Sequence, residues 1–235
     1  MPGANLVSVT GASSGFRRLL AEIILEEGEK AADISSAFHR AKDTFGRVDV
    51  VVNNAAFAAL GEVKSVREED ARLMFETNFW GAIHVTREAV KLSPPLLASL
   101  AVQDWVSMPR QTLEGFSESL AAEIDPSWNI KVTLVEPAGF ETGGRGRVVW
   151  GPPHPAYSDP ELPATRMRNS FEQSRLKYNA CKGAEAFYKI ALVDNPLLHS
   201  PVGPLAMRRA KKKANGLLAD TETYKPWSQD MVKNM

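Results

Sequence analysis

The sequence predicts an α/β domain built on a parallel sheet, and three apolar stretches carry this prediction. Residues 6–9, 50–52 and 130–135 are short apolar runs that end in small or polar residues. Segments with apolar residues about 3.6 positions apart, which is helical spacing, lie between them. Strands that alternate with helices are typical of parallel sheets, because each helix returns the chain to the edge where the next strand begins.

Length and composition agree with one domain and narrow the choice of partners. The chain has 235 residues and a formal net charge of zero, a balance that favours neither nucleic acid nor a membrane surface. With a single cysteine, Cys181, we expect no disulfide framework, no metal site and a reducing, cytoplasmic location. The sequence shows no signal-peptide pattern, and its apolar runs are too short for a transmembrane helix.

Residues 6–20 are expected to form a strand, a turn of small residues and a helix. The apolar run stops at Thr10, and helical spacing begins at Phe16. Backbone N–H groups in such a turn approach a phosphate closely, at the positive end of the helix dipole. The dinucleotide fingerprint has a third glycine for close packing of helix on strand, and Arg17 stands in its place. A plain glycine turn is the alternative interpretation.

A helix follows a helix in the next segment. The first is expected over residues 15–27 and the second over residues 31–45, with Asp33 or Ser35 as its N-cap and Gly46 as its stop. A βαβ unit returns from its helix to a strand, so the second strand, the third strand and the helix between them are expected to be missing.

The strand over residues 48–54 is followed by a loop over residues 55–61 and a long helix over residues 68–91. Asn78 and Gly81 inside that helix lower its intrinsic stability, which indicates a local role.

The second half of the chain alternates regular and irregular segments. Residues 96–102 are apolar without clear periodicity, so no strand is predicted there. Helices are expected over residues 111–124, 167–177 and 183–193, and residues 143–163 are expected to form an irregular flap. The basic cluster at residues 208–213 is interpreted as a solvated helix face, and the last stretch of the tail is expected to be mobile.

Four motifs in order resemble those of the short-chain dehydrogenase/reductase family. Their sequences are TGASSGF at residues 10–16, NNAA at 53–56, NFWG at 78–81 and PAGFET at 137–142. The resemblance implies a Rossmann-like, doubly wound, mostly parallel sheet in a single domain over residues 1–235, lacking the family's second, third and fifth strands. It divides that domain into a cofactor-binding core (5–142), a substrate-lid-like loop (143–180) and a C-terminal helix and tail (181–235).

The resemblance also implies a nicotinamide cofactor, NADP or NAD, at the carboxyl ends of the strands. The positions that match the family's cofactor contacts are Gly11, Ser13, Ser14, Gly15, Phe16, Asn54, Ala55, Pro137, Gly139, Phe140 and Thr142. Asp33 resembles a remnant of the acidic segment near the adenine, and a helix cap is the equal alternative. Because the second strand is missing, so is the residue that would distinguish NAD from NADP.

The family's acid/base residues are largely replaced. Asn78 matches the family's catalytic asparagine, but the tyrosine and lysine positions hold Val106 and Arg110. Valine cannot transfer a proton, whereas Arg110 could still bind a cofactor ribose. Tyr178 and Lys182 also have the spacing of the family's tyrosine–lysine pair, but they follow the sixth strand, and we interpret them as a loop tyrosine before a helix start.

Two functions remain open from the sequence. The first is an oxidoreductase that transfers a hydride between NAD(P) and a small-molecule alcohol or ketone, with the loop over residues 143–177 covering a moderately large apolar substrate. The second is an inactive relative: a pseudoenzyme or a repurposed binding or scaffold protein. In either case the resemblance implies a homodimer through the helices over residues 68–91 and 111–124.

Overall fold

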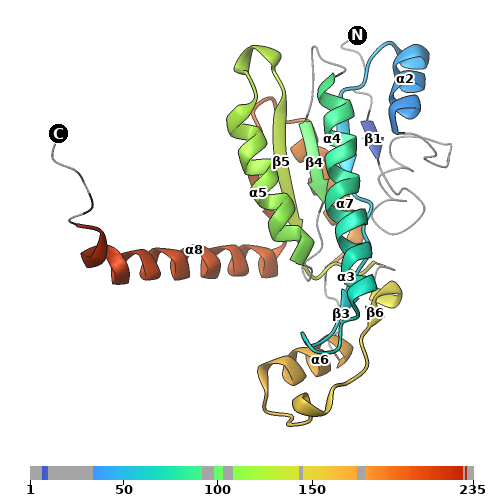
Figure 1. Cartoon of the computed structure of the whole chain (residues 1–235). Coiled ribbons are helices and arrows are strands. Elements are labelled where there is room, and N and C mark those ends of the chain that lie inside the picture. The colour runs from blue at the N-terminus through green and yellow to red at the C-terminus, as the bar shows by residue number, and fades with distance from the viewer. Residues whose placement is uncertain are drawn as a thin grey trace.

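A computed structural model of the chain describes residues 7–9, 34–91, 98–102, 108–142, 145–173, 178–229 and 231. Within these residues the main sheet has five parallel strands in the order β1-β2-β4-β5-β7. Helices cover it on both sides, with α4 and α5 in front and α7 behind in the view of Figure 1. The strands are β1 (Val7–Val9), β2 (Val50–Asn53), β4 (Ala98–Val102), β5 (Lys131–Pro137) and β7 (His199–Val202).

The main helices follow the predicted order. They are α2 (Ile34–Phe45), α3 (Glu68–Phe75), α4 (Gly81–Lys91), α5 (Met108–Glu123), α6 (Pro163–Gln173), α7 (Ala180–Ala191) and α8 (Pro204–Tyr224). Short 3-10 turns occupy Pro126–Trp128, Arg145–Arg147, Pro155–Tyr157 and Lys225–Ser228. In the described part of the chain, every helix is too short or too polar to cross a membrane. The predicted helix over residues 15–27 lies outside the described residues.

The described sheet confirms the doubly wound α/β architecture and has fewer strands than the full fold, with β1 paired to β2. The expectation that the fifth strand is missing is wrong. Strand β4 lies between β2 and β5 and pairs with both. A strand inside a parallel sheet has helices on both faces, so its sequence need not alternate between apolar and polar residues. Periodicity in the sequence therefore gives no sign of this strand.

Strand β7 was also missed. It pairs with β5 and forms an edge of the described sheet. Pro201 lies inside this strand and lacks a backbone N–H, which is why proline is normally confined to edge strands. Pro201 therefore argues against a strand in the sequence, and it agrees with the position of β7 at the edge of the described sheet.

The long helix predicted over residues 68–91 is interrupted by a π-helical segment. Residues Glu76–Trp80 have π-helical geometry between α3 and α4. Single π-helical turns inside an α-helix commonly mark a functional position. Asn78 lies in this segment, so the local role inferred from its low helix propensity has a structural counterpart.

The core lies between the sheet and its helices. Val51 of β2, Val135 of β5 and Phe187 of α7 have no exposed surface. Val51 packs in a cluster with Phe38 of α2 and Val85 of α4. These contacts bury the apolar face of each helix and fix it against the strands, which supplies most of the stability of such a fold.

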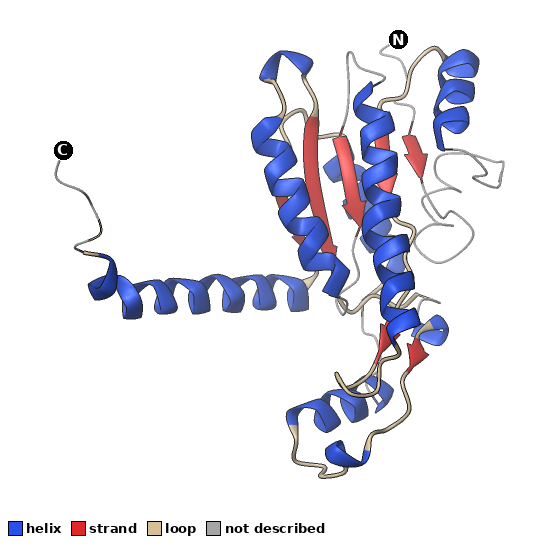
Figure 2. Cartoon of the chain, viewed as in Figure 1, coloured by secondary structure: helices blue, strands red, loops and turns tan. Residues whose placement is uncertain are grey.

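A small lobe lies beyond the carboxyl ends of the main strands, at the bottom of Figures 1 and 2. It consists of a two-stranded parallel sheet, β3 (Ala59–Leu60) with β6 (Val149–Trp150), and helix α6. Of the flap expected over residues 143–163, the described part before α6, residues 145–162, is irregular apart from β6 and two 3-10 turns. Short strands of two residues leave too weak a pattern to be predicted.

Candidate functional site

The carboxyl end of β2 carries the first part of the candidate site. Asn53 and Asn54 are buried, and Ala55 directly after them is exposed. The Asn53 side chain donates a hydrogen bond to Thr86 Oγ1 of α4 at 3.0 Å. This bond fixes the end of the strand against the helix, so that the chain leaves the core at Ala55, one of the predicted cofactor contacts.

Asn78 holds the loop that follows β2. Its Oδ1 accepts a hydrogen bond from Phe57 N at 2.8 Å, and its Nδ2 donates one to Phe57 O at 2.7 Å. One carboxamide thus satisfies both backbone groups of a residue that lies 21 positions earlier. The π-helical turn places Asn78 for this bidentate contact, and the side chain acts here as a clamp on the loop.

The loop after β5 carries the nicotinamide-end positions. Gly139 has a φ of 80°, a conformation that favours glycine, and Pro137 before it is buried. A Cβ on Gly139 would lie 2.8 Å from the Tyr178 ring. Phe140 and Thr142 are half-buried, and the Phe140 ring meets Tyr178 and Phe187 at centroid distances of 5.7 and 6.5 Å. Aromatic packing therefore sets the course of this loop.

Tyr178 is tied to the same loop through its backbone. Its N–H donates to Gly139 O at 3.0 Å, and its carbonyl accepts from Glu141 N at 2.9 Å. Asn179 caps α7 by accepting a hydrogen bond from Lys182 N, while the Lys182 ammonium is exposed and paired with Glu185. The predicted loop tyrosine before a helix start is confirmed. The tyrosine and the lysine do not share a helix.

Several predicted positions lie outside the described residues: Gly11, Ser13, Ser14, Gly15, Phe16, Asp33 and Val106. Arg110 lies in the first turn of α5, and only its backbone is described. The described positions divide into two groups at one edge of the sheet. Asn54 and Ala55 follow β2, while residues 137–142 complete and follow β5, with β4 between the two strands.

The small lobe contains a buried ion pair that the sequence did not reveal. Arg168 of α6 donates hydrogen bonds to Glu62 Oε1 at 2.8 Å and to Gly151 O at 3.1 Å. Its guanidinium carbon lies 4.8 Å from the centre of the Trp150 ring, and Ser65 Oγ donates to Glu62 Oε2 at 2.8 Å. The hydrogen bonds from Arg168 lower the pKa of Glu62 from 4.5 to about 2, against the opposing effect of burial. This network fastens α6 to the loop that follows β3.

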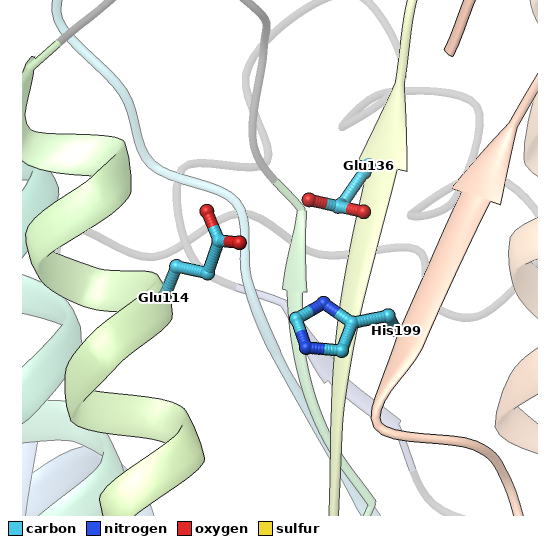
Figure 3. A group of neighbouring side chains, drawn as sticks. All are labelled: Glu114, Glu136 and His199. Carbon is cyan, nitrogen blue, oxygen red and sulfur yellow. The ribbon is translucent and has the colours of Figure 1, made fainter. Parts of the chain in front are cut away.

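A second polar group joins α5, β5 and β7. The ligand-type atoms of Glu114, Glu136 and His199 lie within 4.8 Å of one another, and Figure 3 shows the three side chains converging from these elements. Carboxylate and imidazole groups bind divalent cations. In this group, however, the Lys213 ammonium of α8 donates a hydrogen bond to Glu114 Oε1 at 2.7 Å. We therefore treat the group as an ion-pair cluster that ties α8 to α5.

Comparisons with known proteins identify what the fold resembles. A family model described as enoyl-(acyl carrier protein) reductase matches residues 28–151, just over half of the chain. An uncharacterized oxidoreductase of Schizosaccharomyces pombe is 29% identical over an alignment that covers 86% of this chain and 73% of that protein.

Solved structures give the same answer for the fold. A short-chain dehydrogenase from Streptomyces avermitilis superposes with a TM-score of 0.82 at 22% identity, covering 99% of this chain and 100% of the other. A short-chain dehydrogenase/reductase from Burkholderia phymatum, solved in complex with NAD, has a TM-score of 0.63 at 18% identity, with coverage of 91% and 95%.

Proposed function

Because the chain belongs to the short-chain dehydrogenase/reductase family, we propose that it binds NAD or NADP at the carboxyl edge of its main sheet and transfers a hydride between this cofactor and an alcohol or ketone. The observation that carries the proposal is the bidentate bond of Asn78 to Phe57, which shapes this edge next to the buried Asn54. This contact supports the proposal that the carboxyl edge of the main sheet, in the described part of the chain, still has the shape needed to bind a cofactor.

The described residues fit a dinucleotide. Ala55 and Ala56 are small and exposed after β2, so a ligand could approach the backbone closely there. Phe140 and Thr142 after β5 offer an apolar ring and a hydroxyl, which suits the nicotinamide ring and its carboxamide. When bound, the nicotinamide would supply or accept the hydride.

The chain's own residues would bind and orient the ligand. Asn54 and Ala55 would contact the adenosine ribose, and Pro137, Gly139, Phe140 and Thr142 would flank the nicotinamide. Asn78 is assigned a positioning role, because both polar atoms of its side chain are bonded to the backbone of Phe57. It would hold the loop after β2 in the shape that the cofactor needs.

Hydride transfer to or from the substrate also requires a group that donates or accepts a proton, so this group decides whether the chain turns over a substrate or only binds the cofactor. Val106 occupies the family's tyrosine position and cannot donate a proton, so turnover requires another donor at this edge. Tyr178 packs against the loop that would flank the nicotinamide, and we assign it as the first residue to test as that donor. Cofactor binding without turnover is the second candidate function, and it is motivated by Val106 and Arg110 in the sequence.

The substrate is proposed to be a moderately large apolar alcohol or ketone under the small lobe. The Trp150 and Phe171 rings lie 5.3 Å apart and pack on each other, so they shape the lobe itself. The homodimer expected through the helices over residues 68–91 and 111–124 is part of this proposal. The cytoplasmic location is proposed with it.

The experiment that tests the proposal is a titration of the purified chain with NADPH and with NADH, followed by nicotinamide fluorescence. We expect micromolar binding of one cofactor, and Asn78→Ala should weaken it roughly tenfold because the loop after β2 loses its clamp. Arg72→Ala on the exposed face of α3 is the control and should bind like the parent chain. A folded protein that binds neither cofactor would contradict the proposal.

Turnover is then measured on a panel of aldehydes and ketones. Activity that is lost in Tyr178→Phe would support the oxidoreductase and this tyrosine as donor. Binding without turnover would favour the second candidate. In that case Val106→Tyr combined with Arg110→Lys tests whether the proton-transfer pair is all that is missing.

A further inference from the structure

Helix α8 extends away from the rest of the molecule, as the red helix in Figure 1 shows. It has 21 residues, which at about 1.5 Å per residue gives a rod about 31 Å long. Ala206 near its start is 2% exposed, and Lys213 bonds to Glu114 of α5. Residues 211–229 are all exposed. The body therefore holds α8 through its first turns, and the remainder of the helix extends into solvent.

An apolar stripe runs along this solvated helix. Met207, Leu217 and Tyr224 are 54%, 67% and 52% exposed. With Ala210, Ala214 and Thr221 they form two interleaved rows of seven-residue spacing, 207-214-221 and 210-217-224. This is the heptad pattern of a helix that packs against another helix. A single helix that leaves such a stripe in water is only marginally stable, since tertiary packing of the apolar face supplies most helical stability.

The charges of α8 are separated along its length. Its first half carries a block of basic residues and its second half two acidic ones: Arg208, Arg209, Lys211, Lys212, Lys213, Asp220 and Glu222. A parallel pair of such helices would place one basic block against the other. An antiparallel pair places each basic block beside the acidic residues of the other helix. Charge thus selects the antiparallel arrangement.

The apolar stripe fits the same arrangement. If Ala214 of one helix faces Leu217 of the other, then Met207 faces Tyr224 and Ala210 faces Thr221, which matches a larger side chain with a smaller one in two of the three layers. Lys213, which bonds to Glu114 of its own chain, then lies beside Asp220 of the facing helix, and its ammonium has further donors for that second carboxylate. The stripe is complementary to itself when one copy is turned around.

We propose that α8 is a dimerisation helix that pairs antiparallel with α8 of a second copy of this chain. The body does not cover the stripe beyond the first turns of α8. Leu217 and Tyr224 point in nearly the same direction around the helix as Ala206, which packs on the body, but they lie about 16 and 27 Å farther along it, where residues 211–229 are all exposed. Met207 at the base of the helix points about 100° away from Ala206 and is 54% exposed. The proposed contact is separate from the cofactor edge, so it can fail or hold independently of the proposed function.

Sedimentation velocity of the full chain tests the proposal. The α8 contact adds one association step to any homodimer formed through α4 and α5, so at micromolar concentration the parent chain should sediment at twice the mass of Leu217→Lys. This variant should raise the dissociation constant of the α8 step at least tenfold, because it places a charge in the centre of the apolar contact. The matched control is Ala219→Lys, which adds the same side chain about 200° around the helix and should leave the dimer intact. Circular dichroism checks that both variants remain folded, as expected for exposed positions.

Two outcomes would overturn the proposal. One is a monomer at all concentrations, which would mean that the stripe serves another partner. The other is a dimer that Leu217→Lys leaves unchanged, which would place the contact elsewhere, for example on α4 and α5.

The orientation of the helices is tested by disulfide trapping in a Cys181→Ser background. A chain with Ala214→Cys is mixed with a chain with Leu217→Cys and mildly oxidised. Antiparallel pairing predicts that the mixed disulfide predominates. Predominance of the two self-disulfides would indicate parallel pairing and contradict the arrangement proposed here.

Discussion

The main sheet and the small lobe are held together by different forces. In the sheet, side chains such as Val51, Val135 and Phe187 are wholly buried and apolar. In the small lobe Ala59 and Leu60 of β3 are buried too, but the contact that joins segments 106 positions apart is the buried ion pair of Glu62 with Arg168. Apolar burial tolerates small shifts because it is not directional, whereas a buried ion pair requires its geometry to be kept. We therefore expect the sheet to resist local damage and the lobe to depend on a few contacts.

The largest effect is expected in the core behind the sheet. Phe187→Ala removes a fully buried ring that packs against Phe140, and it should cost about 4 kcal/mol in the free energy of unfolding, measured by urea denaturation. The control is Tyr188→Ala, the next residue of α7, which is 39% exposed. A loss for Tyr188→Ala as large as for Phe187→Ala would show that this helix is not packed as described.

The next effect is expected in the lobe. Arg168→Ala leaves the Glu62 carboxylate buried without its cation, which typically costs about 3 kcal/mol. Hydrogen exchange should show faster amide exchange over residues 145–173, while β2 and β5 keep their protection.

Two further variants sharpen this comparison. Arg166→Ala, on the same helix but in an exposed pair with Glu161, should change little. Replacing both Glu62 and Arg168 by methionine should recover much of the protection, because it removes both charges from the lobe. If the double variant exchanged as fast as Arg168→Ala, the unpaired charge of Glu62 would not be the cause of the faster exchange.

Low pH is expected to destabilise the small lobe more than the main sheet. Because the folded pKa of Glu62 lies at about 2 against 4.5 for a free carboxyl, its contribution to stability is fully present above about pH 4.5 and is lost as the pH falls towards 2. The carboxyl carbon-13 shift of Glu62 should titrate near pH 2 in the parent chain and at or above its ordinary value in Arg168→Ala, because burial raises the pKa once the cation is gone. An unchanged midpoint in that variant would mean that Arg168 does not depress the pKa.

The same contrast explains what could be predicted from the sequence. Residues 50–52 predict a buried strand, because three consecutive valines favour a strand wherever they pack. The motif that begins at residue 137 indicates a turn at Gly139. Strands β4 and β7 could not be recognised, because β4 lacks alternation and Pro201 argues against a strand until its edge position is known. Their formation depends on neighbours distant in sequence.

The candidate site shows the same limit. Asn54, Ala55 and residues 137–142 could be proposed as cofactor contacts from the sequence, because each motif is short and contiguous. The clamp from Asn78 to Phe57 and the bond from Arg168 to Glu62 span 21 and 106 positions, and no local pattern links their partners. Asn78 could be singled out from two signals, its low helix propensity inside a predicted helix and its place in the NFWG motif. Glu62 and Arg168 carry no comparable signal in the sequence.

The smallest effect concerns backbone spacing inside the lobe. A Cβ on Gly151 would lie 2.4 Å from the backbone oxygen of Ser65, closer than atoms can approach, so Gly151→Ala must push the segment after β6 away from the loop that carries Glu62. Overpacking of this kind typically costs about 1–3 kcal/mol, and we expect the lower part of that range because the shift is confined to the lobe.

The matched control for this last change is Gly146→Ala, since a Cβ at Gly146 meets nothing within 4 Å. Hydrogen exchange over residues 145–173 compares the two variants directly. If Gly151→Ala were as well protected as Gly146→Ala, the lobe would adapt to a backbone shift as readily as an apolar core. Its dependence on a few exact contacts would then be refuted. Faster exchange in Gly151→Ala alone would show that the position of Gly151, whose carbonyl accepts a hydrogen bond from Arg168, is needed to keep the ion pair in register.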